Sequence, residues 1–173
     1  MNKLLIKSLL AGSAGLILLL FVTGARTAGD NPHVISRQTA QTGCSDCHNT
    51  IPEMKGDAIL HSQNLPVDQA SFSKDGVAMC SSCHNPNQGH KVGLNIDFPV
   101  PADLPLNEDN DITCLTCHYT HGKLDSDRPQ ASFSFMDRLM NAERLKKSFL
   151  LRRNNSDGEL CLTCHNVNQG SSK

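Results

Sequence analysis

All eight cysteines of this 173-residue chain fall in one repeated motif, in which two cysteines three positions apart are followed at once by a histidine. The four copies are CSDCH at 44–48, CSSCH at 80–84, CLTCH at 114–118 and CLTCH at 161–165. A disulfide pair does not need the histidine, and a zinc site made of two CxxC pairs leaves the four histidines unexplained. CxxCH is the attachment signature of c-type haem. The sequence therefore predicts four haem c groups, each with its iron.

The spacing within each motif matches one turn of a helix, in which positions i, i+3 and i+4 share a face. The two cysteines can therefore bond to the two vinyl groups of one porphyrin, while the histidine reaches its iron. We expect the cofactor-binding residues to be Cys44, Cys47, Cys80, Cys83, Cys114, Cys117, Cys161 and Cys164. The corresponding iron ligands are expected to be His48, His84, His118 and His165.

Four further histidines match the number of predicted irons. A six-coordinate iron needs a second axial ligand, usually histidine or methionine. Four histidines remain, one for each predicted iron, so every haem can have two histidine ligands. These histidines are His33, His61, His90 and His121. His121 lies one helical turn after His118, on the same side of that porphyrin, so we expect it to bind the iron of a neighbouring haem. Met136 and Met140 lie at helical spacing and are expected to serve in apolar packing instead.

The chain has few large apolar side chains with which to fill an interior. Residues 26–173 contain no tryptophan, one tyrosine and five phenylalanines. A chain of this size with so few large side chains struggles to form a conventional core. We therefore predict a mostly irregular fold with short α-helices, in which four stacked haems form the core. No catalytic residue is expected.

The motifs recur along the chain as one haem per structural unit. Their first cysteines stand at 44, 80, 114 and 161, hence at intervals of 36, 34 and 47 residues, with an insertion before the last unit. Polar turns are expected to begin the short haem-bearing helices at Asp75-Gly76, Asp109-Asn110 and Asp157-Gly158. In the insertion, Ser134 with Asp137 at the N3 position predicts a helix over about 135–151.

The predicted insertion helix has an apolar stripe and a basic face. We interpret the stripe, which consists of Met136, Leu139, Met140 and Phe149, as a lid packed on porphyrin edges. The basic face consists of Arg138, Arg144, Lys146, Lys147, Arg152 and Arg153. It is either a solvated face that pairs with haem propionates or a docking patch for an acidic redox partner.

Residues 1–25 have the pattern of a signal peptide. A basic start precedes an apolar run of 14 residues, from Leu9 to Val22, and small residues follow it. A transmembrane helix usually needs about 20 apolar residues, so we expect no stable membrane span after cleavage. Residues 26–173 would then be a periplasmic or extracellular tetrahaem domain. Their 14 basic and 17 acidic side chains exclude the basic footprint of a nucleic-acid-binding protein.

Three segments resemble the multihaem c-type cytochromes of the doubled-CxxCH kind, which are related to the class III tetrahaem cytochromes c. They are CSSCHNPNQGHKVG (80–93), LPLNEDNDITCLTCHYTHG (104–122) and FLLRRNNSDGELCLTCHN (149–166). The resemblance implies an irregular fold around closely packed low-spin haems that transfer electrons outside the cytoplasm. The family often uses the histidine of a GHxVG segment and the second histidine of CHxxHG as iron ligands, which correspond to His90 and His121 here.

The favoured function is that of a soluble electron carrier between redox partner proteins, because bis-histidine ligation leaves no vacant iron site for a substrate. The alternative is a subunit of a polymeric extracellular cytochrome filament, in which His33 binds a haem of the next subunit. An enzyme is disfavoured. The CxxCK motif of some multihaem reductases is absent from this sequence. The apolar run at the amino terminus is also shorter than a membrane-anchored quinol dehydrogenase needs.

Overall fold

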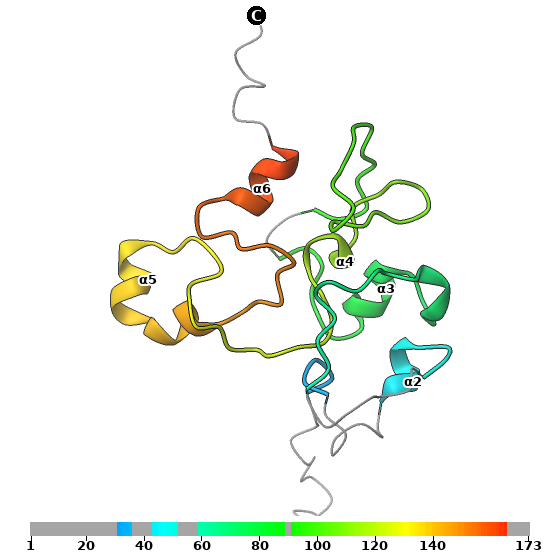
Figure 1. Cartoon of the computed structure of the whole chain (residues 1–173), viewed down its shortest axis with the longest axis horizontal. Coiled ribbons are helices and arrows are strands. Elements are labelled where there is room, and N and C mark those ends of the chain that lie inside the picture. Colours follow the sequence, from blue (N-terminus) through cyan, green and yellow to red (C-terminus); the bar gives the residue numbers. More distant parts are fainter. Residues whose placement is uncertain (1–30, 36–42, 52–58, 89–90, 166–173) are drawn as a thin grey trace, which may run out of the picture. The chain divides into compact units, whose positions relative to one another are not determined.

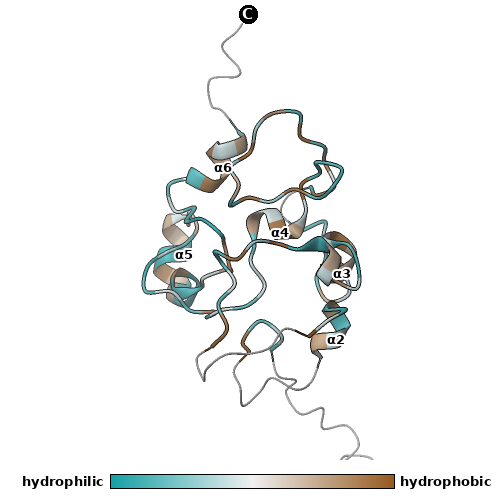
Figure 2. Ribbon diagram, turned by 45° about the vertical axis from the view of Figure 1, so that its right-hand side comes forward, coloured by the Kyte–Doolittle hydropathy of each residue, from teal (hydrophilic) through white to brown (hydrophobic). Residues whose placement is uncertain are grey.

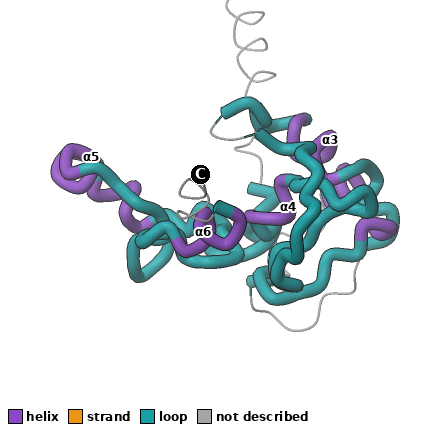
Figure 3. The backbone as a smooth tube through the Cα atoms, turned by 90° about the horizontal axis from the view of Figure 1, so that it is seen from above, coloured by secondary structure: helices purple, strands orange, loops and turns teal. Residues whose placement is uncertain are grey.

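The computed structural model describes residues 31–35, 43–51, 59–88 and 91–165. The chain divides into two units, residues 1–30 and 31–173, and the described residues all belong to the second. In this part of the chain, short helices are joined by irregular segments, and strand pairing is limited to isolated β-bridges (Figure 3). The predicted fold class, mostly irregular with short α-helices, is confirmed. The predicted signal peptide and His90 lie outside the described residues.

The described helices are all short, and most of them carry a motif cysteine (Figure 1). They are α2 (Cys44–Cys47), the 3₁₀-helix η1 (Gln69–Ser71), α3 (Gly76–Ser81), α4 (Cys114–Cys117), α5 (Phe135–Met140), the 3₁₀-helix η2 (Ala142–Lys146) and α6 (Glu159–Cys164). Of the described α-helices, only α5 has no cysteine. The helical turn expected at the CxxC pairs is therefore present at all four.

Local capping explains where these helices begin. The Asp75 carboxylate accepts hydrogen bonds from the two backbone N–H groups of Val77 and Ala78, both at 2.9 Å, and so starts α3. At α4, Thr113 and Thr116 form a reciprocal capping box. This differs from the expected start at Asp109-Asn110, which lies in the preceding turn. Gly158 precedes α6 with φ of 82°, a left-handed conformation that glycine adopts without strain.

The described residues form a small apolar interior, much of it close to the third motif. Its most buried side chains are Leu104 and Leu115, each 2% exposed, together with Met79, Tyr119, Leu150 and Leu160. Residues 148–152, which we call the strap, cross the end of α4. The Tyr119 N–H donates to the Leu150 carbonyl at 2.8 Å, and the Arg152 N–H donates to the Cys117 carbonyl at 2.9 Å. The strap therefore covers the third motif with its own hydrogen-bonded backbone.

The insertion begins as predicted but does not continue as one helix to residue 151. The Asp137 N–H donates to the Ser134 hydroxyl at 3.1 Å, which is the expected N-cap of α5. However, α5 ends at Met140, because Asn141 has φ −126° and ψ 52°, outside the helical region. A 3₁₀-helix, η2, follows to Lys146, and the strap comes after it. The length predicted for this helix is therefore wrong.

The apolar stripe of α5 is exposed in the described chain. The exposed fraction is 59% for Met136, 65% for Leu139 and 71% for Met140. Figure 2 shows both hydrophobic and hydrophilic residues along this helix. The apolar packing expected for Met136 and Met140 is therefore not provided by the described residues. Their packing on porphyrin edges stays a prediction.

The basic face of the insertion is smaller than expected. Arg152 is only 9% exposed, so its assignment to an exposed face is wrong. Arg153 binds both carboxylate oxygens of Asp103. Two further basic side chains form ion pairs, Arg144 with Asp137 at 2.8 Å and Lys147 with Asp125 at 3.4 Å. Four of the six basic side chains are therefore buried or paired, which weakens the interpretation of this face as a docking patch.

Helices long and apolar enough to cross a bilayer do not occur within residues 31–35, 43–51, 59–88 and 91–165.

The Asp75 cap gives a direct test of how α3 is held. Replacing Asp75 with alanine leaves two backbone N–H groups at the start of the helix without their acceptor. We expect Asp75→Ala to lower the free energy of unfolding by about 1 kcal/mol, measured by denaturant titration. The exposed Asp97, which caps no helix in the described chain, provides the control as Asp97→Ala. Equal stability of the two variants would contradict this account of α3.

Candidate haem-binding sites

All four CxxCH motifs share one backbone hydrogen bond. In each motif the histidine N–H donates to the carbonyl of the first cysteine, at 2.8 Å for His48, 2.9 Å for His84, 3.0 Å for His118 and 2.8 Å for His165. This bond closes one helical turn and brings the two cysteines and the histidine to the same face. None of the cysteine pairs forms a disulfide. The local geometry required to hold one porphyrin is therefore present four times.

Successive motifs are neighbours in space. The Cys80 thiol, at the second motif, lies against Cys114 of the third. Burial and then Cys114 raise the pKa of Cys80 to about 12. The pKa of Cys47 is raised by burial, by Asp46 and then by Cys83 of the next motif. Burial also raises the pKa of Cys117, with contributions from the two cysteines of the fourth motif, Cys164 and Cys161. The order of the motifs in space thus follows their order in the sequence.

Three of the histidine rings are fixed by backbone carbonyls. Nδ1 lies 2.8 Å from the Thr120 carbonyl in His33, 2.7 Å from the Phe149 carbonyl in His118 and 3.1 Å from the Pro32 carbonyl in His121. A carbonyl oxygen can only accept, so each Nδ1 carries the hydrogen, and in the neutral ring Nε2 then has the lone pair. This is the tautomer that metal-binding histidines usually adopt.

The Phe149 carbonyl reaches His118 from a strained turn of the strap. Phe149 and Leu150 have φ of 50° and 49°, the left-handed conformation that costs a residue with a Cβ atom about 1 kcal/mol or more. This strained turn aims an acceptor at the ring of a predicted iron ligand. We therefore assign the strap a positioning role at the third motif.

Two of the additional histidines lie beside motif histidines, at ring-centroid distances that match those of two imidazoles bound to one iron. The ring centroids are 6.1 Å apart for His48 and His121 and 5.9 Å apart for His33 and His84. Imidazole nitrogen binds a metal ion at about 2 Å, so two rings on opposite sides of one metal have centroids about 6 Å apart. The donor set and its spacing therefore fit bis-histidine ligation at the first and second motifs.

These two pairs are joined by a reciprocal contact, which we call the histidine clasp. The His33 ring binds the carbonyl of Thr120, the residue before His121, and the His121 ring binds the carbonyl of Pro32, the residue before His33. The Gly122 N–H also donates to the His33 carbonyl at 2.9 Å. Segments from the start of the described chain and from the third motif therefore hold each other's histidine in place.

The His121 ring is neutral at ordinary pH. Burial lowers its pKa to about 4, and the nearby His48 and His33 contribute in the same direction. A neutral imidazole is the form that binds iron. The buried Nδ1 of His48 has no hydrogen-bond partner among the described residues, and its ring is held by Phe72 at 5.1 Å and by His121. An unpaired buried nitrogen is tolerated mainly where the group has a further role.

The structure also places His61 beside the third motif. Its ring lies 5.1 Å from that of Tyr119, which directly follows His118. A Cβ atom on the buried Gly122 would lie 3.2 Å from His61 Nε2, so both rings pack closely on this glycine. His165 is exposed at the end of α6, and His90 lies outside the described residues. The structure thus brings together six of the eight predicted ligands around the first three motifs, namely His33, His48, His61, His84, His118 and His121.

Sequence reasoning missed the groups that orient these rings. The carbonyls of Pro32, Thr120 and Phe149 carry no signal in the sequence, because every residue has a carbonyl. The positive φ angles at Phe149 and Leu150 are equally hidden, since neither residue type favours them. The exception is Gly122, the glycine of CHxxHG, because a glycine in a sequence can indicate that another group lies close to the backbone.

The fold and these sites define a small multihaem c-type cytochrome. Residues 30–119, a little over half of the chain, match the family described as cytochrome c7 and related cytochrome c. The chain therefore belongs to this family of multihaem electron carriers, and the predicted resemblance is confirmed. The match includes the first three CxxCH motifs, and the fourth lies beyond it. Comparisons with the curated proteins and with the solved structures gave no significant match.

The close packing at Gly122 provides a test of the His61 environment. A Cβ atom there would lie 2.7 Å from Tyr119 Cε2, which forces the Tyr119 ring to move. Overpacking of this kind costs about 1–3 kcal/mol, so we expect Gly122→Ala to lower the free energy of unfolding by that amount. In a Tyr119→Leu background the penalty should be smaller, because the clashing atom is gone. An equal penalty in both backgrounds would show that the ring contact is not its cause.

Proposed function

We propose that this protein is an exported tetrahaem c-type cytochrome that carries electrons between redox partner proteins. The observation that carries the proposal is the fourfold repetition of one local geometry, the CxxCH turn closed by a hydrogen bond from histidine to the first cysteine. Membership of the cytochrome c7 family supports haem c as the cofactor and electron transfer as the activity. When bound, haem c supplies reversible one-electron chemistry at its iron.

We propose that the thioether bonds form at Cys44 and Cys47, Cys80 and Cys83, Cys114 and Cys117, and Cys161 and Cys164. His48, His84, His118 and His165 are the proposed proximal ligands. The ring distances favour His121 as the second ligand of the iron on His48, and His33 as that of the iron on His84. His61 and His90 are then left for the third and fourth irons. Because His61 contacts Tyr119, which follows His118, we assign His61 to the iron of the third motif and His90 to that of the fourth.

In this assignment the chain's own residues act by position. The backbone carbonyls of Pro32, Thr120 and Phe149 hold three imidazoles in the tautomer that leaves Nε2 able to bind iron. The contacts between successive motifs keep neighbouring attachment cysteines close together, from the first motif to the fourth. Fixed and nearby sites suit a carrier, since electron transfer then requires little rearrangement of the protein.

The position of His33 favours a carrier over a filament subunit. In the filament alternative, this histidine binds a haem of the next molecule. Here its ring binds Thr120 and lies beside His84 within the same chain. An intramolecular ligand completes the site without a second molecule.

Removing one cysteine pair tests the number and independence of the sites. We expect the wild-type protein, produced in a host that matures c-type cytochromes, to contain four haems by the pyridine haemochrome assay. The Cys80→Ala/Cys83→Ala variant should contain three, because each motif binds its own haem. Ser81→Ala, which leaves both sulfur atoms in place, is the matched control and should contain four. A colourless wild-type protein, or one containing zinc, would overturn the proposed function.

Replacing His33 tests the second ligand at the second motif. The His33→Ala variant should convert one of four low-spin ferric signals to a high-spin signal in the EPR spectrum, and it should bind carbon monoxide when reduced. Val34→Ala keeps the ring and should give the wild-type spectrum. Size-exclusion chromatography of both proteins checks that the chain is a monomer. A fully low-spin His33→Ala protein would exclude His33 as a ligand.

A further inference from the structure

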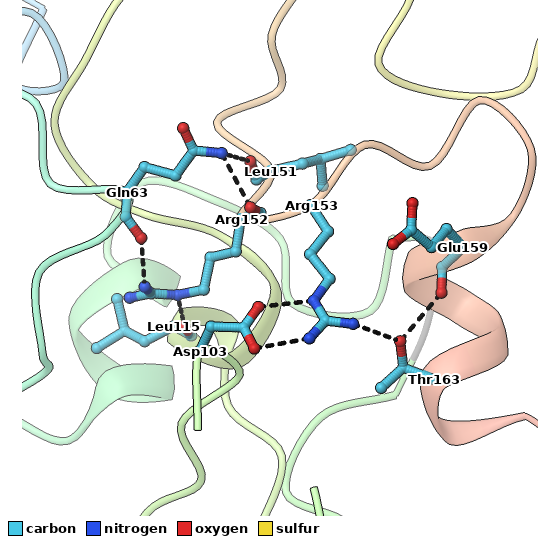
Figure 4. Close-up of polar contacts among 8 residues, drawn as sticks. All are labelled: Gln63, Asp103, Leu115, Leu151, Arg152, Arg153, Glu159 and Thr163. Carbon is cyan, nitrogen blue, oxygen red and sulfur yellow. Dashed lines mark hydrogen bonds and ion pairs between the residues drawn. The ribbon is translucent and has the colours of Figure 1, made fainter. Parts of the chain in front are cut away.

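Arg152 is a buried cation at the third motif. The residue is only 9% exposed. Its Nε donates to the Leu115 carbonyl at 2.7 Å and its Nη1 donates to the Gln63 carbonyl at 2.9 Å (Figure 4). Both acceptors are uncharged. A guanidinium stays protonated under ordinary conditions, so these contacts orient its charge without neutralising it.

The guanidinium is held rigidly against the haem-attachment segment. Leu115 lies between the two cysteines of the third motif, so Arg152 touches the backbone to which a porphyrin would be bonded. The Arg152 N–H also donates to the Cys117 carbonyl at 2.9 Å. On the other side, the Gln63 side chain donates to the carbonyls of Leu151 at 3.2 Å and Arg152 at 2.9 Å. The charge therefore cannot swing away into solvent.

The neighbouring carboxylate is already bound by another arginine. Asp103 accepts from Arg153 Nε at 2.6 Å and from Arg153 Nη2 at 2.7 Å. Figure 4 shows Asp103 between the two arginine side chains. Glu159 also acts on Arg153, so two carboxylates accompany the two guanidinium groups, but neither is hydrogen-bonded to Arg152. Burying a charge in this way costs free energy, which is a reason to look for a role beyond stability.

The first two motifs have carboxylates beside them. Asp46 lies between Cys44 and Cys47, and Asp75 caps the helix that leads into Cys80. Lys74 also lies near Cys47, so the first motif has charges of both signs. Arg152, by contrast, places a fixed positive charge directly against the backbone of the third motif, through its bonds to the carbonyls of Leu115 and Cys117.

We propose that Arg152 is a positioning residue that makes the 114–118 site easier to reduce than the sites at 44–48 and 80–84. This inference rests on the proposed function. Reduction adds one electron to one iron, taken from a redox partner protein; no bond in the chain breaks and Arg152 keeps its proton. A fixed positive charge stabilises the state with the additional electron. An electron that enters the chain is therefore held preferentially at the third motif.

The test is a spectroelectrochemical titration of the complete haem-loaded protein. In Arg152→Gln, which removes the charge but keeps an amide donor, we expect the equilibrium constant for reduction of one haem to fall about tenfold, a shift of about 59 mV for one electron. In Arg152→Lys, which keeps the charge, most of the wild-type value should be retained. The affected site is identified by NMR of the partly reduced protein, through the signals that connect the His118 ring to Tyr119, the chain's only tyrosine.

A second variant has the opposite expected sign and does not disturb the buried guanidinium. Asp103→Asn removes the compensating carboxylate, so the same haem should become easier to reduce. The control is Arg144→Gln, which removes an exposed cation paired with Asp137 on α5 and should leave this haem unchanged. If Arg152→Gln does not incorporate haem, the titration of Asp103→Asn alone shows whether the reduction potential of this haem shifts in the expected direction.

The outcomes separate this inference from the proposed function. A shift confined to the 114–118 site, downward in Arg152→Gln and upward in Asp103→Asn, supports it. Unchanged titrations in a variant that binds four haems overturn it, as does an equal shift in Arg152→Gln and Arg152→Lys, which would indicate a purely structural role. A chain without haem would instead overturn the proposed function.

Discussion

A backbone carbonyl that accepts a hydrogen from imidazole Nδ1 is the interaction on which the candidate sites depend. It occurs at His33, His118 and His121, and in each case the acceptor comes from a distant segment. Because the carbonyl has no hydrogen to give, it selects one tautomer and one ring orientation together. In the neutral rings, the chain thus presents Nε2 atoms that carry the lone pair and have a fixed orientation. Less conformational freedom is then lost when a metal binds.

The third motif has the most support from the surrounding chain. The few buried apolar side chains gather around it, and the strap contributes a carbonyl to His118, a backbone bond to Tyr119 and the guanidinium of Arg152. By contrast, the apolar side chains of α5 are exposed in the described chain. The buried part of the described chain therefore lies mainly near the third motif, which is also where the histidine clasp contacts it.

Much of each site could be predicted from the sequence, because its parts are local. The CxxCH spacing predicts a helical turn, and the Ser134 and Asp75 caps follow from residue type and position. The pairing of His33 with His84 could not be predicted, because it depends on contacts between segments far apart in the chain. Neither could the early end of α5, where Asn141 leaves the helical region. The burial of Arg152 was equally hidden, since arginine is usually exposed and only the path of the strap brings it inside.

The histidine clasp has a consequence for biosynthesis. The chain is made from its amino terminus, so CSDCH and CSSCH are translated well before CLTCH and His121. Under the proposed ligation, the first site takes its second axial ring from His121, beyond the third motif, whereas the second site takes His33, which precedes both motifs. The first centre would therefore stay five-coordinate until the chain through residue 121 has been exported, so completion of the earliest attachment site depends on the middle of the polypeptide.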